Sequence, residues 1–206
     1  MKMIDDILAI GKVMPVIVID SHEQAVPLAK ALLAGGIKTI EITLRTSAAL
    51  DAIRAVADTC PDITVGAGTV VSAQLAKKAT DAGASFLVSP GTTDAVIEGA
   101  RTAGAALLPG AASVSEIMRL NDAGFNTIKF FPAMAAGGPS FVKSLISPLA
   151  NVRVCPTGGI TLANAPEWLS LANVPCVGGS WIAPQTMIAE GDFAGITKRA
   201  AEAATL

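Results

Sequence analysis

A strand-like segment and a helix-like segment alternate along the chain at a nearly constant interval. Eight apolar runs with the composition of buried strands begin 20 to 27 residues apart, and an Ala- and Leu-rich segment at helical spacing follows each of them. Such an interval has room for one strand, one helix and two short loops. The runs span residues 13–19, 37–44, 64–70, 86–89, 106–109, 127–131, 152–156 and 174–178, and a short helix over residues 5–12 precedes the first.

The ends of the helix-like segments indicate how these units connect. Four of them place a glycine after the last helical turn, where a left-handed C-cap is favoured: Gly36, Gly83, Gly104 and Gly124. Repeated strand–helix units with right-handed crossovers close most naturally into a barrel. An open doubly wound sheet is the alternative, but the turn after the first strand lacks the GxGxxG pattern that is common there. We therefore predict an α/β fold, a compact (β/α)8 TIM barrel with a short N-terminal helix, in which residues 1–206 form one domain.

The composition excludes several classes of partner. Half of the residues (51%) are hydrophobic but only 4% are aromatic, so the core must consist of Ala, Val, Ile and Leu. A net charge of -2 with 16% charged residues argues against binding to nucleic acid or to an anionic membrane surface. No apolar run approaches the roughly 18 residues of a membrane span, and the first residues do not have the pattern of a secretory signal. We expect a cytoplasmic protein that acts on a small metabolite.

Histidine and cysteine are too sparse to build a metal site. His22 is the only histidine, and Cys60, Cys155 and Cys176 form no CxxC pair. We expect the cysteines to be reduced, two of them in buried strands, and we expect no metal and no cofactor.

One lysine lies within an apolar, aromatic-flanked strand, residues 127–131. The alternation of side chains places Lys129 on the same face as Thr127 and Phe131. A poorly solvated site disfavours an ammonium relative to the neutral amine, and a neutral amine can attack a carbonyl group to form a Schiff base. Lys129 is therefore a candidate nucleophile. The simpler interpretation is that its long side chain carries the charge out to water.

Polar side chains also end the second strand. Alternation places Glu41, Thr43 and Arg45 on one face, which we expect to point into the barrel. In such barrels the C-terminal ends of the strands carry the chemistry. An internal Glu41–Arg45 ion pair without a functional role is the alternative.

Three further strand ends are rich in glycine or proline. After the third strand, the glycines of Gly66-Ala67-Gly68 would let the backbone approach a ligand, and Thr69 offers a hydroxyl. The segments Ser89-Pro90-Gly91 and Leu108-Pro109-Gly110 have the composition of rim turns.

Adjacent glycine pairs follow the seventh and eighth strands. Gly158 and Gly159 end the seventh, and Gly178 and Gly179 end the eighth, directly before Ser180. Many barrels hold a phosphate group with backbone N–H groups of these two loops. We therefore predict a phosphate-binding site at this position.

Six segments, taken in order, resemble the family of 2-keto-3-deoxy-6-phosphogluconate (KDPG) aldolase and KHG/KDPG aldolase, class I aldolases of the Entner–Doudoroff pathway. They are IEITLRT (40–46), VGAGTV (65–70), FLVSPG (86–91), KFFPA (129–133), CPTGGI (155–160) and VGGSW (177–181). The resemblance covers nearly the whole chain. It implies a lyase without metal that cleaves KDPG to pyruvate and glyceraldehyde 3-phosphate through a Schiff base. Cleavage of 4-hydroxy-2-oxoglutarate to pyruvate and glyoxylate is a related activity of such enzymes.

The resemblance also implies roles for individual residues. Lys129 matches the Schiff-base lysine, and Glu41 matches the general acid/base that exchanges protons through a water molecule. The expected substrate-binding residues are Arg45, Thr69, Phe131, Pro90 and Thr157, and the expected phosphate-binding residues are Gly158, Gly159, Gly179 and Ser180.

Some of the implications leave alternatives. Met134 follows KFFPA, where many relatives have an acidic residue, so the choice among sugar acids stays open. One alternative is an aldolase for the epimer 2-dehydro-3-deoxy-6-phosphogalactonate. Another is a barrel that binds a phosphorylated metabolite without turnover. The resemblance further implies a homotrimer.

Overall fold

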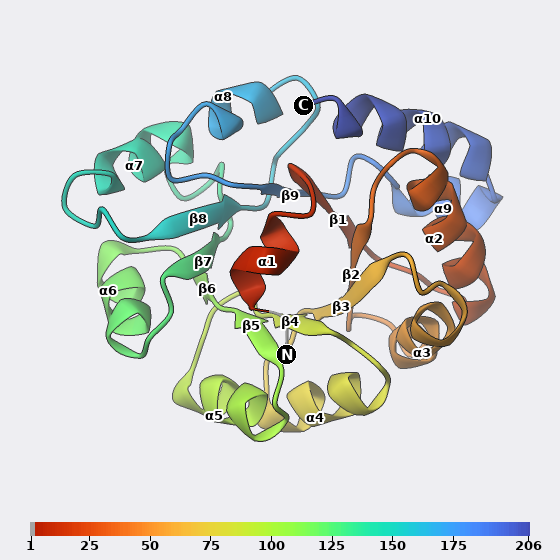
Figure 1. Ribbon diagram of the computed structural model, residues 1–206, viewed down its shortest axis with the longest axis horizontal. Helices are drawn as coiled ribbons and strands as arrows, with labels where there is room; N and C mark the ends of the chain where they lie inside the picture. Colours follow the sequence, from red (N-terminus) through yellow and green to blue (C-terminus); the bar gives the residue numbers. More distant parts are fainter. Residues whose placement is uncertain (1–2) are drawn as a thin grey trace.

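The computed structural model describes residues 3–206, and its strands are arranged in a curved layer with helices around it (Figure 1). All strand pairs are parallel. The strands are β1 (Val13–Ile17), β2 (Thr39–Thr43), β3 (Thr64–Gly68), β4 (Phe86–Val88), β5 (Ala106–Leu108), β6 (Gly110–Ala111), β7 (Thr127–Phe130), β8 (Arg153–Pro156) and β9 (Val177–Gly179). The helices are α1 (Ile4–Leu8), η1 (His22–Gln24), α2 (Ala25–Ala34), α3 (Ala49–Thr59), α4 (Ala73–Asp81), α5 (Asp94–Thr102), α6 (Val114–Asp122), α7 (Gly138–Leu145), α8 (Ala165–Leu169), α9 (Gln185–Glu190) and α10 (Phe193–Ala204).

The strands form two sheets that adjoin at both of their edges. One has six strands in the order β5-β4-β3-β2-β1-β9, and the other has three in the order β6-β7-β8. At one junction only Pro109 separates β5 from β6. At the other, Thr157 forms a parallel bridge with Gly178 of β9. The protein is thus an α/β fold with a curled parallel sheet.

Apolar side chains on the outer face of the strands pack against the helices. Ile40 and Ile42 of β2 and Ile128 and Phe130 of β7 are fully buried in this cluster, as the alternation of side chains predicts. Phe130 stacks on Phe141 of α7, with the ring centroids 4.9 Å apart. Each such residue contributes about 1.5–3 kcal/mol by its burial. This outer layer supplies stability, so that polar side chains can occupy inward positions of the same strands.

Helix α1 occupies the space inside the strands at their N-terminal end, near the centre of Figure 1. Its Ile7 and Leu8 are buried against inward side chains, namely Met14, Phe86, Val88, Ala106, Leu108, Cys155 and Cys176. Asp5 Oδ1 accepts a hydrogen bond of 2.5 Å from the Thr127 hydroxyl and lies 3.6 Å from Arg153 Nη1. Since Thr127 and Arg153 begin β7 and β8, α1 is attached to the starts of these strands and closes this end.

The cysteines and the helix ends agree with the sequence analysis. All three cysteines are free and buried, although Cys176 lies just before β9 and not within a strand. A hydrogen bond with Cys155, together with burial, raises the pKa of the Cys176 thiol. The four predicted C-cap glycines have positive φ angles, 87° at Gly36, 98° at Gly83, 65° at Gly104 and 95° at Gly124.

Several predicted boundaries were wrong. The strands expected at 13–19 and 64–70, for example, both end two residues early, at Ile17 and Gly68. The leading helix ends at Leu8 and does not extend to residue 12. The strand expected at 106–109 ends at Leu108, because Pro109 has no N–H to donate, and a further short strand, β6, follows it. The last strand begins at Val177 instead of residue 174, since the N–H of Val174 donates to the carbonyl of Leu171 in a turn. Within residues 3–206 no helix has both the length and the apolar character needed to cross a membrane.

Candidate active site

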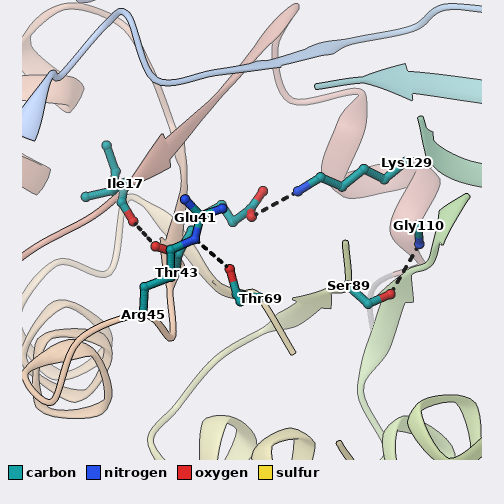
Figure 2. A network of polar contacts seen from close by, with 8 residues as sticks. All are labelled: Ile17, Glu41, Thr43, Arg45, Thr69, Ser89, Gly110 and Lys129. Atoms are coloured by element: carbon teal, nitrogen blue, oxygen red, sulfur yellow. Dashed lines mark hydrogen bonds and ion pairs between the residues drawn. The ribbon is translucent and has the colours of Figure 1, made fainter. Parts of the chain in front are cut away.

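Lys129 is buried and points toward Glu41 across the interior (Figure 2). The residues are 4% and 2% exposed, and Lys129 Nζ lies 3.4 Å from Glu41 Oε1. The same nitrogen lies 5.5 Å from the ring centroid of Phe131, within the range of a cation–π contact. Of the two interpretations of this lysine, the one in which its charge reaches bulk water is therefore wrong. An amine and a carboxylate in contact, largely shielded from water, are suited to nucleophilic attack coupled to proton transfer.

Glu41 owes its position to β2 and to the space left by a glycine of β3. A Cβ atom built on Gly68 would overlap the Glu41 carboxylate. On the same face of β2, Thr43 is fully buried and donates a 2.7 Å hydrogen bond to the carbonyl of Ile17, which fixes β2 against β1. Glu41 and Lys129 thus approach each other because β3 has no side chain at this point.

Two glycines of β3, which we predicted to let the backbone approach a ligand, lie against side chains of neighbouring strands. Gly66 makes room for the ring of Phe86, and Gly68 makes room for Glu41. Their effect on the site is indirect, through the position of Glu41.

Arg45 and Thr69 lie together beyond the ends of β2 and β3. Arg45 Nε donates a 3.1 Å hydrogen bond to Thr69 Oγ1 (Figure 2). Thr69 has a φ of 59°, a left-handed conformation that is strained for a β-branched residue. The bond uses one of five guanidinium N–H groups, so Arg45 can still bind an anion. The alternative of a Glu41–Arg45 ion pair is wrong, because Glu41 pairs with Lys129.

A cavity of about 450 Å³ opens at the C-terminal ends of the strands. Its size is in the range of small-ligand sites. Seven of the predicted site residues line it: Arg45, Phe131, Thr157, Gly158, Gly159, Gly179 and Ser180. The structure thus brings the predicted phosphate loops and Arg45 around one space.

The two glycine loops have backbone conformations and contacts that other residues would not tolerate. Gly158 and Gly159 have φ angles of 103° and 77°. A Cβ on Gly178 would overlap the hydroxyl of Thr157, and one on Gly179 would overlap the ring of Trp181. These glycines let backbone N–H groups approach a bound anion closely.

The loop after β7 is fixed to the first of these glycine loops. The N–H of Ala133 donates to the carbonyl of Thr157 at 2.8 Å, and that of Met134 donates to Gly158 at 3.1 Å. The Met134 side chain lies so close to Gly159 that a Cβ there would collide with it. Met134, at the position where many relatives have an acidic residue, therefore lies beside the predicted phosphate loop.

Other residues depart from the sequence-based expectation. Four predicted site residues do not line the cavity, namely Glu41, Thr69, Pro90 and Lys129. The backbone of Pro90 lies against Gly110. Trp181 and Gln185 line the cavity but were not predicted as site residues. Trp181 directly follows the Gly-Gly-Ser segment, which was the available signal, whereas nothing in the sequence around Gln185 indicates a site. Among residues 3–206 no group of three His, Cys, Asp or Glu side chains is arranged to hold a metal ion.

Known proteins closely similar to the chain are aldolases. The chain is 48% identical to 2-dehydro-3-deoxy-phosphogluconate aldolase of Pseudoalteromonas atlantica over 198 residues, which is 96% of this chain and 92% of that protein. Two solved structures are also close. One is KDPG aldolase from Legionella pneumophila with pyruvate captured at low pH as a covalent carbinolamine intermediate, with 43% identity, a TM-score of 0.94 and 96% coverage of both chains. The other is the Zymomonas mobilis ZM4 aldolase with 3-phosphoglycerate, with 44% identity, a TM-score of 0.91 and coverage of 98% of this chain and 94% of that one.

The family model for KDPG and KHG aldolases matches residues 4–199. The match and the relatives both extend over nearly the whole chain, and the segment that contains Lys129 lies within it. The chain belongs to the KDPG and KHG aldolase family.

Proposed function

We propose that this protein is a class I aldolase that cleaves 2-dehydro-3-deoxy-6-phosphogluconate to pyruvate and glyceraldehyde 3-phosphate. The observation that carries the proposal is the contact between the buried Lys129 amine and the Glu41 carboxylate, 3.4 Å apart, beneath a cavity lined by Arg45 and two glycine loops. The Legionella relative, with pyruvate captured as a carbinolamine, supports an amine nucleophile for this reaction.

In the proposed mechanism Lys129 attacks the C2 ketone, and loss of water from the carbinolamine gives an iminium ion. The iminium accepts the electron pair of the C3–C4 bond as that bond breaks. Glu41 takes the proton of the C4 hydroxyl, and the fragment that contains C4 leaves as the aldehyde. The resulting enamine is protonated at C3, and hydrolysis of the imine then releases pyruvate and regenerates Lys129. Phe131 lies 5.5 Å from the lysine nitrogen, so its ring face also favours the cationic iminium.

The ends of the substrate have separate binding groups in this proposal. The Arg45 guanidinium, with the Thr69 hydroxyl to which it is bonded, binds the carboxylate of the keto acid. Gly158, Gly159, Gly179 and Ser180 bind the phosphate, and Thr157 contacts the substrate between them. The Zymomonas relative, with bound 3-phosphoglycerate, supports a site for a phosphorylated three-carbon acid in this family. Pro90, the remaining predicted substrate-binding residue, does not line the cavity, and neither do Lys129, Glu41 and Thr69.

We further propose that the two sheets make one closed (β/α)8 barrel, that the chain is a single domain, and that it assembles as a cytoplasmic homotrimer. The single residue between β5 and β6 and the Thr157–Gly178 bridge support closure. Sedimentation equilibrium at micromolar concentration is expected to give three times the mass of one chain. A stable monomer would exclude the trimer without affecting the barrel.

Reductive trapping tests the aldolase function directly. After incubation with pyruvate and borohydride, we expect an intact mass increased by one reduced pyruvate adduct, and peptide mapping should place it on Lys129. Pyruvate is the product common to the candidate aldolase reactions, so the result does not depend on the aldehyde. A folded protein without an adduct would favour the alternative, a barrel that binds a phosphorylated metabolite without turnover.

The preferred aldehyde partner is then found by comparing substrates. We expect the gluconate series to be cleaved with a higher kcat/KM than the galactonate epimer. Unphosphorylated 4-hydroxy-2-oxoglutarate should react with a higher KM, because it leaves the glycine loops empty.

A further inference from the structure

We propose that Ser89 and Thr92 are positioning residues for Lys129, an assignment that rests on the proposed aldolase function. Both lie in the loop after β4, on the side of β6 opposite β7. Ser89 is fully buried and Thr92 is partly buried. Neither side chain is part of the cavity, yet both hydroxyls bind the backbone of Gly110, the residue that is paired with Lys129. Figure 2 shows the bond between Gly110 and Ser89.

The hydroxyls form a closed ring with the backbone of Gly110. The N–H of Gly110 donates to Ser89 Oγ at 3.2 Å, and Thr92 Oγ1 donates to the carbonyl of Gly110 at 3.0 Å. The two hydroxyl oxygens are 2.9 Å apart. Because a hydroxyl has one hydrogen, and that of Thr92 is used on the Gly110 carbonyl, Ser89 must be the donor to Thr92. Every donor in the ring is thus used once.

The ring supplies the hydrogen bonds that a neighbouring strand would otherwise form with Gly110. The last backbone bond of the β4–β5 ladder joins the N–H of Ser89 to the carbonyl of Leu108. Beyond it Pro90 has no N–H, so the loop cannot continue a ladder alongside β6. Gly110 would then have a buried N–H and a buried carbonyl without partners, a costly arrangement. The two hydroxyls replace the backbone groups that a longer β4 would have provided.

The opposite edge of the same short strand holds the reactive residue. The N–H of Lys129 donates to the carbonyl of Pro109 at 2.8 Å, and that of Phe131 donates to Ala111 at 3.1 Å. These carbonyls flank Gly110 on either side, and β6 has only two residues. On its other side Lys129 pairs with Cys155 of β8. On this side its position depends on Gly110, which is held by the ring. Gly110 is also in close contact with the backbone of Pro90, so that even a Cβ would collide there.

The consequence is a specific kinetic effect. Loss of the ring lets β6 shift, and Lys129 Nζ then leaves its 3.4 Å contact with Glu41. A displacement of about 1 Å can cost up to about 100-fold in rate. The binding groups Arg45 and Thr69 are attached to β2 and β3, so substrate affinity should change little.

The test compares Thr92→Val, which loses the hydroxyl at nearly the same volume, with Thr92→Ser, which keeps the hydroxyl but lacks one methyl group. We expect Thr92→Val to lower kcat and the rate of the borohydride-trapped pyruvate adduct about tenfold, with KM within about twofold of the parent value. Thr92→Ser should restore both rates to within about twofold. Thr197→Val is the matched control, because the partly buried hydroxyl of Thr197 on α10 also lies within hydrogen-bond distance of backbone carbonyls, 3.1 Å from that of Ala31 and 3.0 Å from that of Phe193. It should lower the melting temperature without a change in kcat.

The inference is overturned if Thr92→Val loses thermal stability as Thr197→Val does but keeps kcat and the trapping rate. Ser89→Ala and Thr92→Ala test the same ring with smaller side chains, so a Thr92→Val protein that does not fold leaves the proposal falsifiable. A parent protein that forms no adduct would overturn the proposed function, and this positioning role with it.

Discussion

Replacing Lys129 by alanine is expected to abolish aldol cleavage. No other group described within the interior offers a nucleophilic amine, so Lys129→Ala should lower kcat/KM by a factor on the order of 10⁴ to 10⁶. The variant should also form no adduct with pyruvate and borohydride. A coupled assay of pyruvate release and intact-mass measurement check the two results. Because Glu41 then loses its buried partner, the free energy of unfolding should fall by about 3 kcal/mol.

The matched control for this variant is Lys77→Ala. Lys77 forms an ion pair of 2.8 Å with Asp81 on the surface of α4, where its side chain is 73% exposed. Such pairs contribute little, so kcat/KM should equal that of the parent. A Lys129→Ala protein that retains turnover, or an adduct that maps to another lysine, would show that Lys129 is not the nucleophile.

Glu41→Gln is expected to produce the second largest loss. Glutamine keeps the size and one acceptor oxygen of the side chain but cannot accept the proton of the C4 hydroxyl. General acid–base catalysis contributes about 10² to 10⁴ in rate, so kcat should fall by that factor. Pyruvate should still be trapped on Lys129, more slowly, because the nucleophile remains. A kcat within about twofold of the parent value would assign the proton transfer to another group.

A steric version of the same experiment uses Gly68→Ala. The new Cβ would occupy the position of the Glu41 carboxylate, so the carboxylate must move although Glu41 itself is unchanged. We expect kcat to fall by about 10², in the same direction as for Glu41→Gln. Gly11→Ala is the control, because a Cβ at Gly11 meets no atom within 4 Å. Full activity of Gly68→Ala would mean that the carboxylate position is not critical.

The alternation of side chains predicted the central part of this site correctly. The polar face of β2 and the position of Lys129 on β7 follow from period two alone, because an outer face of Ile and Phe must pack against helices. The glycine loops that line the cavity were found because glycine pairs after two successive strands occupy one end of such a fold. Each of these signals lies within a short segment of the sequence, so it can be recognised without knowing which distant residues are in contact.

Contacts between residues far apart in the chain could not be predicted in this way. Gly68 lies 27 residues beyond Glu41, and only the register of β2 with β3 shows that it accommodates the carboxylate. The hydroxyls of Ser89 and Thr92 have partners only because a short strand, β6, follows Pro109, the residue at which the predicted strand ended. Gln185 reaches the cavity through the placement of α9, which hydrophobic pattern does not determine.

Helix α1 has a consequence for the order of events in turnover. Its Ile7 and Leu8 fill the end where the strands begin, whereas the cavity lined by the glycine loops opens at the opposite end. In the proposed mechanism the aldehyde carries the phosphate toward those loops, while pyruvate stays bonded to Lys129. We therefore expect ordered product release, with the aldehyde first and pyruvate second, and in the synthetic direction we expect pyruvate to bind before the aldehyde.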